Sequence, residues 1–301
     1  MTRLTVFTPT YNRAKLLTRS YEAMKRQTNK NFIWMIIDDG STDHTKDMAE
    51  SWAEEEKEFS IVYYHKENGG LHTAYNEAIA HIETELCVCI DSDDYMPDDA
   101  VEKILSFWEE NGSDEYAGIV GLDYYADGSG IVGGDPLPDL KSVNLIDLMT
   151  GKYPIHNGDR TDVVRTELYR QFAPMKVFPG EKNFNPHYMH LQISKTYDFL
   201  VLNENLRFVE YQPDGMSNSM LKQYRNSPNS FVEIRKLYLS FSDTDFKFKF
   251  RNSIHLVSSC ILAGKFAKVL KESPCPAITF FAIPFGAALT VYVLWKTRGV
   301  K

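Results

Sequence analysis

The sequence predicts an α/β protein whose mostly parallel sheet is flanked by helices, with a helical extension at the C-terminal end. Short β-branched runs alternate with amphipathic stretches through the first half of the chain, which is the pattern of βαβ units. A long uncharged stretch close to the C-terminus predicts the extension. With 301 residues, of which 43% are hydrophobic, the chain has room for one large domain and an appendage.

The predicted strands and helices of the first half follow one another in alternation. β-branched runs predict the strands, and apolar residues spaced by three or four positions predict the helices. In chain order these elements are strand 4–8, helix 13–27, strand 33–37, helix 42–58, strand 61–64, helix 71–82, strand 86–90, helix 97–110 and strand 117–122. Parallel strands joined by helices meet with their carboxyl ends at one edge of the sheet, where the ligands of such folds bind.

The C-terminal extension contains the stretch 276–295, which is free of charge and about long enough to cross a bilayer. Pro284 and Gly286 predict a kink or break in its middle. Lysines and arginines lie on both sides, so the charges indicate no orientation. Three interpretations remain open: a transmembrane span, a segment lying in the membrane surface, and a buried pair of helices. We expect a domain of residues 1–215, followed by a helical extension of residues 216–301.

The composition disfavours some partners. A net charge of −8 and a pI near 5.5 argue against a nucleic-acid binder, which needs a clustered basic face. The four cysteines show no metal-site spacing, and Cys87 and Cys89 fit a buried strand, so a reducing compartment is expected. Residues 4–7 read as a strand and lack the apolar length of a secretory signal. We therefore expect the large domain in the cytoplasm.

The acidic run 91–94, Asp-Ser-Asp-Asp, is the most informative motif because it directly follows a predicted buried strand. Closely spaced carboxylates at the carboxyl end of a strand can hold a divalent cation against a phosphate. The run therefore predicts a metal–nucleotide site. An EF-hand loop is one alternative, but Tyr95 and Met96 stand where that loop needs an oxygen ligand and a glycine. A solvated acidic turn that caps the next helix is another alternative.

Four loops at the predicted strand ends carry an ordered set of motifs. They read Pro-Thr-Tyr-Asn-Arg at 9–13, Asp-Asp-Gly-Ser-Thr-Asp at 38–43, Glu-Asn-Gly-Gly at 67–70 and Asp-Ser-Asp-Asp at 91–94. In this order they make the chain resemble the family 2 glycosyltransferases, strongly over residues 1–125 and loosely over 150–215. The resemblance implies the GT-A fold, a Rossmann-like nucleotide-binding architecture, and an enzyme that uses a nucleotide-diphosphate sugar.

The resemblance also implies roles for individual residues. Tyr11 offers an aromatic surface to the base, a carboxylate such as Asp39 accepts hydrogen bonds from the nucleoside, and Gly70 allows close approach. The residues expected to bind the donor are Thr10, Tyr11, Arg13, Asp39, Gly70, Asp91 and Ser92. Those expected to ligate Mg²⁺ or Mn²⁺ are Asp91, Asp93 and Asp94, with His187 or His190 as a candidate further ligand.

The implied reaction is the attack of an acceptor hydroxyl on the anomeric carbon of the sugar, with inversion of configuration. It needs a base beside the acceptor and positive charge on the leaving diphosphate. Members of the family often carry a Glu-Asp motif that supplies the base, whereas this chain has Glu181 followed by Lys182. Glu181 is the first candidate base and Asp159 is the second. A non-processive enzyme that adds one sugar is favoured.

The resemblance and the apolar tail together predict partners and a location. We expect a donor that is a UDP-sugar, an acceptor that is lipid-linked or a growing oligosaccharide, and contact with a membrane surface at the cytoplasmic face of the cell membrane. The expected setting is bacterial capsule or related surface-polysaccharide synthesis. A membrane-tethered protein that binds nucleotide sugars without turnover is a rival interpretation. An aspartyl phosphotransferase is disfavoured, because Tyr95 stands where its signature needs threonine.

Overall fold

A computed structural model of the chain describes residues 2–156, 158–212 and 219–298. The chain divides into two compact units. The first comprises Met1–Gly69, Thr73–Met175 and Met189–Gln212, and the second comprises Gly70–His72, Lys176–Tyr188 and Pro213–Lys301. The predicted boundary between residues 215 and 216 falls outside the described residues. Lys176–Tyr188, which contains the candidate base Glu181, belongs to the same unit as the C-terminal helices.

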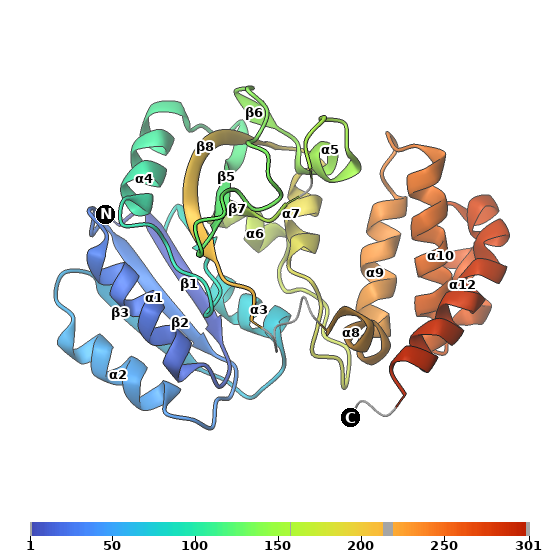
Figure 1. Cartoon of the computed structure of the whole chain (residues 1–301), viewed down its shortest axis with the longest axis horizontal. Helices are drawn as coiled ribbons and strands as arrows, with labels where there is room; N and C mark the ends of the chain where they lie inside the picture. Colours follow the sequence, from blue (N-terminus) through green and yellow to red (C-terminus); the bar gives the residue numbers. More distant parts are fainter. Residues whose placement is uncertain (1, 157, 213–218, 299–301) are drawn as a thin grey trace. The chain divides into compact units, whose positions relative to one another are not determined.

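The first unit is built on a mixed sheet, in which the described residues form eight strands (Figure 1). The strands are β1 (Leu4–Thr10), β2 (Phe32–Asp38), β3 (Ser60–His65), β4 (Leu86–Cys89), β5 (Tyr116–Tyr125), β6 (Ser142–Val143), β7 (Arg160–Arg165) and β8 (Asp198–Val209). Their order across the sheet is β3-β2-β1-β4-β7-β5-β8-β6. The pairs β1–β2, β2–β3, β1–β4 and β5–β8 are parallel, and the others are antiparallel. The prediction of a mostly parallel α/β sheet is confirmed.

Helices connect the strands as the alternation predicted. They are α1 (Ala14–Arg26), α2 (Thr45–Glu55), α3 (Leu71–His81), α4 (Ala100–Asn111), α5 (Leu145–Thr150), α6 (Thr166–Phe172) and α7 (His187–Ile193). Helix α2 begins later than predicted, because the Asp43 carboxylate accepts hydrogen bonds from the N–H groups of Ala14 and Thr45, both at 3.1 Å. Asp43 therefore ties α1 to the start of α2.

One hydrophobic cluster packs against the first strands of the sheet. The clustered strand residues Leu4, Val6 and Trp34 are fully buried, and side chains from α1 and α4 pack with them. The Trp34 ring stacks with those of Tyr21 and Trp52, with ring centroids about 6 Å apart. Buried aromatic groups of this kind contribute most to the apolar area removed from water. The central strands, and hence their carboxyl ends, are fixed by this packing.

The second unit is helical. Its helices are α8 (Met220–Asn226), α9 (Pro228–Leu239), α10 (Phe246–Leu262), the short 3₁₀ helix η2 (Phe266–Lys268), α11 (Val269–Glu272) and α12 (Pro276–Lys296). Helix α10 lies between α9 and α12 and packs on both (Figure 1). Val232, Leu239, Leu256, Val257, Cys260 and Val269 form its buried cluster.

Helix α12 is the one helix of the described part of the chain that is long and apolar enough to cross a membrane, with a mean hydropathy of 2.0. It is continuous through Pro284, so of the predicted kink or break the break is wrong, and the kink stays a prediction. The helix packs on α10. A Cβ atom at Gly286 would lie 2.5 Å from Val257 Cβ, so the glycine allows the two helices to approach closely.

Candidate functional site

The loops after β1 and β2 are hydrogen-bonded to each other. The Asn12 N–H donates to Ser41 Oγ at 2.9 Å, and the Thr42 N–H donates to Asn12 Oδ1 at 2.8 Å. Asn12 has a φ of 53°, in the left-handed region that asparagine tolerates better than most residues. The segments that carry the first two motifs thus form a single ordered edge of the sheet.

Asp39 is the most heavily contacted carboxylate of this edge and is only 5% exposed. The Lys66 Nζ lies 2.6 Å from Asp39 Oδ1, and the Gly69 N–H donates to the same oxygen at 2.9 Å. Asn68 Nδ2 donates to Asp39 Oδ2 at 3.1 Å. Asp39 is therefore held in one orientation by the loop after β3, which is the Glu-Asn-Gly-Gly motif of the sequence.

Thr10 and Tyr11 complete this edge. Thr10 pairs with Asp38 in the parallel ladder, and its carbonyl accepts a hydrogen bond from the Asp39 N–H at 2.9 Å. The buried Thr10 Oγ1 has no hydrogen-bond partner among the described residues, so a ligand can satisfy it. Tyr11 is 47% exposed and presents an open aromatic ring. The structure thus brings Thr10, Tyr11 and Asp39 together as predicted, and Arg13 follows them at the start of α1.

The acidic run lies directly after β4, which pairs with β1. Asp91 and Asp93 are partly exposed, whereas Ser92 and Asp94 are buried at 8% and 5% exposure. The Asp91 carbonyl accepts a hydrogen bond from the Asp94 N–H at 3.0 Å, which closes a tight turn. This turn leaves the Asp91 and Asp93 carboxylates as the accessible acidic groups of the run.

Asp94 points at β8 instead. Its Oδ1 accepts a hydrogen bond from the Glu210 N–H at 3.2 Å, and its Oδ2 lies 3.6 Å from the Arg207 guanidinium. Tyr95 and Phe208 form a bridge beside it through reciprocal backbone hydrogen bonds of 3.2 and 2.8 Å. These contacts join the acidic loop to β8 through the Asp94 carboxylate, and the predicted role of Asp94 as a metal ligand stays a prediction.

Arg207 is a residue that the sequence did not predict to be important. Its side chain is 13% exposed and pairs with the Asp123 carboxylate, which is fully buried and also accepts a hydrogen bond from Thr161 Oγ1 at 2.6 Å. Arg207 thus compensates two buried carboxylates, Asp94 and Asp123. No local pattern points to it, since its partners come from other strands and loops that are distant in the sequence.

The carboxylates at this edge have unusual pKa values. Burial raises the pKa of Asp94 to about 8, although the Arg207 charge lowers it and Asp91 raises it again. Burial likewise raises the pKa of Asp91; Arg207 lowers it, and the nearby Asp93 and Asp159 charges raise it. Besides burial, the neighbouring carboxylates contribute to these raised pKa values, so several acidic groups lie close together at this edge. Such a site favours a bound cation.

Glu181 has the surroundings of a helix cap. It is 6% exposed, and its Oε1 accepts hydrogen bonds from the Asn229 N–H and Nδ2 at 2.8 and 2.7 Å. Its Oε2 accepts from the Ser230 N–H and Oγ at 2.8 and 2.7 Å. Both oxygens are thus engaged at the N-terminus of α9, where negative charge is stabilised. This geometry gives Glu181 a structural role as a cap and favours Asp159 as the base, and the assignment of Glu181 as the base stays a prediction.

Gly70 is held by the same segment of the second unit. It has a φ of +94°, and a Cβ there would lie 1.9 Å from the Lys182 carbonyl oxygen. Only glycine fits both the conformation and this close approach. The structure therefore explains Gly70 by its contact with the backbone of Lys182, and its predicted contact with a donor stays a prediction.

Asp159 remains as the second candidate base. It is exposed, and its Oδ2 accepts a hydrogen bond from the Tyr211 hydroxyl at 2.8 Å. Its charge contributes to the raised pKa values of both Asp91 and Asp123, so it lies within electrostatic reach of the acidic loop. Asp159 thus combines solvent access with proximity to Asp91, which a general base for an incoming acceptor requires.

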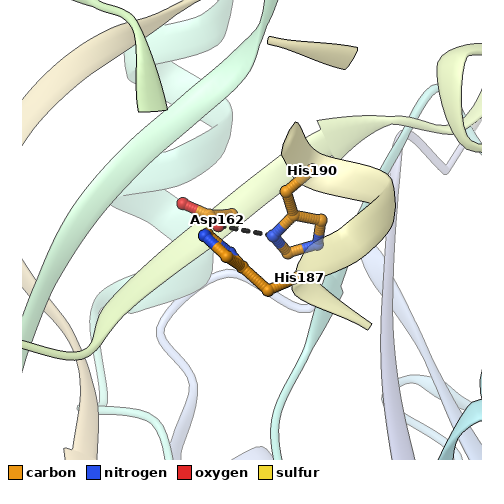
Figure 2. A group of neighbouring side chains, drawn as sticks. All are labelled: Asp162, His187 and His190. Atoms are coloured by element: carbon orange, nitrogen blue, oxygen red, sulfur yellow. Dashed lines mark hydrogen bonds and ion pairs between the residues drawn. The ribbon is translucent and has the colours of Figure 1, made fainter. Parts of the chain in front are cut away.

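The two candidate histidines lie one turn apart on α7, and Figure 2 shows them with Asp162 of β7. One ligand atom from each of the three side chains lies within 4.8 Å of the others, and within the described ranges this is the only such group. His190 Nδ1 lies 2.6 Å from Asp162 Oδ2, and its Nε2 is hydrogen-bonded to the Tyr169 hydroxyl. The structure thus groups the histidines with Asp162, a residue the sequence reasoning missed, rather than with Asp91 and Asp93.

Known proteins provide an independent comparison. The uncharacterized glycosyltransferase RC0461 of Rickettsia conorii is 39% identical over 110 residues, which is 36% of this chain and 18% of that protein. TuaG of Bacillus subtilis, whose name refers to teichuronic acid biosynthesis, is 30% identical over 107 residues, which is 36% of this chain and 42% of TuaG. The matched part thus spans less than a fifth of the first relative and less than half of the second.

Two solved structures resemble the whole fold. The crystal structure of S. aureus TarS 1–349 with UDP-GlcNAc has a TM-score of 0.62 at 18% identity, covering 98% of this chain and 91% of that one. The mannosyltransferase PcManGT from Pyrobaculum calidifontis, in complex with GDP-Man and Mn²⁺, has a TM-score of 0.57 at 17% identity, covering 98% of this chain and 82% of that one. At these identities the likeness concerns the fold, and it confirms the GT-A architecture.

The α/β sheet with its acidic carboxyl edge thus has the architecture of the GT-A fold. Residues 5–130 match the family model described as Glycosyl transferase family 2. This match over the N-terminal part of the chain agrees with the family resemblance that the order of the four loop motifs indicated.

Proposed function

We propose that the protein is a metal-dependent inverting glycosyltransferase that moves one sugar from a nucleotide-diphosphate sugar to a hydroxyl of a lipid-linked or growing surface glycan. The observation that carries the proposal is the sheet edge: oriented Asp39 and exposed Tyr11 follow β2 and β1, and Asp91 and Asp93 follow the neighbouring β4. We place the nucleoside of the donor beside Asp39 and Tyr11. We place the diphosphate, with its metal ion, beside Asp91 and Asp93.

The donor side of the reaction uses groups already described. The Tyr11 ring would stack on the base, Asp39 would accept hydrogen bonds from the nucleoside, and the unpartnered Thr10 Oγ1 would bind a polar group of the donor. A UDP-sugar is our first choice of donor. Its support is the TarS complex with UDP-GlcNAc, whereas PcManGT binds GDP-Man within the same fold.

The residues of the acidic loop fit a divalent metal ion. Carboxylate oxygens are the ligands that Mg²⁺ and Mn²⁺ prefer, and Asp91 and Asp93 are the accessible carboxylates of the loop. When bound, such an ion supplies positive charge to the departing diphosphate. Arg207 would keep the loop in place through Asp94.

In the bond-forming step the acceptor oxygen attacks the anomeric carbon from the face opposite the diphosphate. A new C–O bond forms, the bond from that carbon to the diphosphate oxygen breaks, and the diphosphate leaves with the electron pair. The acceptor proton passes to the Asp159 carboxylate, which is exposed and within electrostatic reach of Asp91. Tyr211 would orient Asp159 through its hydroxyl.

The expected location is the cytoplasmic face of a bacterial cell membrane, in the synthesis of capsule or a related surface polysaccharide. The names of relatives such as TuaG support this setting. The non-catalytic alternative, a nucleotide-sugar-binding protein, keeps one argument: Glu181 caps α9, so the catalytic reading depends on Asp159 as the base.

The test is a thermal-shift titration with UDP-, GDP-, CMP- and dTDP-sugars, each with and without Mn²⁺. Ligand binding to the folded state raises the melting temperature by mass action. We expect one nucleotide class to stabilise the protein only with Mn²⁺, and Asp93→Ala to abolish the effect, whereas the exposed Asp127→Ala keeps it. Stabilisation by no donor would refute the proposed donor site.

A second measurement separates the enzyme from the binding protein. Asp159→Asn should reduce turnover by about 10²-fold or more, as expected for loss of a general base, while the donor-induced thermal shift persists. Donor binding without turnover in the unsubstituted protein, across acceptor lipids and oligosaccharides, would favour the non-catalytic alternative.

A further inference from the structure

Helix α12 exposes a broad apolar surface. The exposed large side chains of this helix are Phe280, Phe281, Phe285, Val291, Tyr292, Leu294 and Trp295. Phe281 and Val291 are 68% and 67% exposed, and Trp295 is 58% exposed. The segment before α12 adds exposed Phe266 and Leu270. A contiguous apolar surface of this kind marks a site of interaction rather than an ordinary solvent face.

The opposite side of α12 is fixed to the rest of the second unit. Thr279 Oγ1 donates to Ser253 Oγ at 3.2 Å, and Thr290 Oγ1 donates to Ser258 Oγ at 3.0 Å. At the end of the helix, Arg225 donates to the Thr297 carbonyl at 2.9 Å. Helix α12 is therefore bound along its length to α10, and its apolar face is presented on a rigid support.

Charge distinguishes this part of the chain from the rest. Residues 246–301 contain nine lysines and arginines and one acidic residue, Glu272, whereas the residues before them contain 24 basic and 40 acidic side chains. Lys268 and Lys271 precede α12, and Lys296 and Arg298 follow its apolar stretch; all four are exposed. An apolar face with cationic residues at both ends matches the acyl and headgroup layers of an anionic lipid surface.

The packing of α10 and α9 opposes a transmembrane orientation. Helix α12 cannot cross a bilayer alone while it stays bound to α10, and α10 is in turn packed on α9. Helix α9 carries Glu233, Arg235 and Lys236 in its middle, and Lys236 pairs with both Glu233 and Glu272. A spanning arrangement would bring these charges into the hydrocarbon region, where charged side chains are strongly disfavoured.

If α12 lies in the plane of the membrane, its apolar, aromatic and basic side chains can each reach the layer that they prefer. The phenylalanines would enter the acyl boundary, Tyr292 and Trp295 would lie at the interface that aromatic residues with polar atoms prefer, and the basic residues at both ends would reach headgroups. The side of α12 that faces α10 would remain in protein. Basic residues on both sides of the segment, which indicate no orientation for a span, are what an in-plane helix needs.

We propose that the exposed face of α12, with Phe266 and Leu270, binds in the plane of an anionic lipid bilayer without crossing it. This surface lies wholly within the second unit, and its binding does not require glycosyl transfer. The proposed enzyme would thereby be held at a membrane surface.

Flotation of the purified full chain with preformed vesicles tests the proposal. Vesicles of phosphatidylcholine are compared with vesicles that also contain phosphatidylglycerol, at low and high salt. We expect binding to be at least about ten-fold tighter to the anionic vesicles and to weaken with salt. The double variant Phe281→Ser with Trp295→Ser should bind the anionic vesicles about ten-fold or more weakly than the unsubstituted protein. Leu140→Ser, at a 49% exposed apolar side chain of the first unit, is the matched control and should bind like the unsubstituted protein.

Orientation is tested by labelling. Lys271→Cys and Arg298→Cys flank α12, and a membrane-impermeant maleimide added outside should label both positions on vesicle-bound protein, as identified by peptide mass spectrometry. Protection of one position only would show a span and overturn the proposal. Binding to neutral and anionic vesicles with equal affinity would overturn it as well. A concentration-dependent dimer that does not bind vesicles would also overturn the proposal, if the double variant Phe281→Ser with Trp295→Ser abolishes that dimer. In that case a second copy of the chain would cover the apolar face.

Discussion

The two units of this protein treat charge in opposite ways. In the first unit, carboxylates are drawn into the sheet edge and compensated there by Arg207 and Lys66, which are themselves mostly buried. In the second unit, basic residues surround an exposed apolar helix, and buried polar groups such as Thr279 and Thr290 pair with hydroxyls of a neighbouring helix. The first arrangement suits a small anionic ligand with a metal ion, and the second suits a surface.

Replacement of Arg207 gives the largest expected effect, because it removes the compensation on which the first unit depends. Arg207→Met would leave the Asp123 and Asp94 carboxylates buried without a cation. We expect the free energy of unfolding to fall by about 3–5 kcal/mol, measured by urea denaturation. Arg26→Met, which removes a solvent-exposed pair with Asp98, is the matched control and should cost less than about 1 kcal/mol.

If Arg207→Met and Arg26→Met lower the free energy of unfolding equally, the buried ion pairs of Arg207 stabilise the protein no more than an exposed pair does. If Arg207→Met does not fold, the double variant with Asp123→Leu restores an apolar pair and should recover part of the stability. Failure of that rescue would indicate that Arg207 acts through contacts other than Asp123.

Replacement of Glu181, a buried carboxylate of the second unit, tests whether this side chain serves the structure. Glu181→Gln replaces one acceptor oxygen by an amide that faces the donors at Asn229 or Ser230. We expect a loss of about 2 kcal/mol in the unfolding of the helical unit and turnover within a few-fold of the original. The measurement combines denaturation with a glycosyl-transfer assay. If Glu181→Gln instead lowers turnover by about 10²-fold or more and leaves the stability unchanged, Glu181 acts as the base.

The smallest expected effect concerns His255 of α10. Burial, together with the Arg235 and Arg251 charges, lowers the pKa of His255 from 6.5 to about 4. Because the folded state disfavours the protonated ring, the unfolded chain takes up the proton first as the pH falls. The stability contributed by neutral His255 is therefore complete above pH 6.5 and is lost as the pH falls towards 4, by on the order of 1–2 kcal/mol.

His255→Gln should flatten the dependence of the unfolding free energy on pH between these two values, as measured by denaturation at a series of pH values. His44→Gln, at an exposed histidine of the first unit, should leave the slope unchanged. An unaltered slope in His255→Gln would mean that other groups govern the acid sensitivity of the helical unit.

The sequence predicted the parts of the site that are local to one strand and its loop. Asp39, Asp91 and Asp93 follow apolar runs directly, and the rule that parallel strands share a carboxyl edge is enough to bring them together. It did not predict Arg207 or Asp162, and it did not predict that Asp94 contacts Arg207 or that Glu181 caps α9. In each of these cases the deciding partner comes from a distant segment, and no local periodicity carries that information.

The same division holds for the helical tail. Length, absence of charge and basic flanks, all readable from the sequence, established that residues 276–295 form an apolar segment fit for a membrane. Only the tertiary structure decided that the segment continues through Pro284, that Gly286 seats it against Val257, and which of its sides stays exposed. Burial depends on which segments meet in space. The sequence pattern shows that a segment is apolar, but it does not show which other segment packs on it.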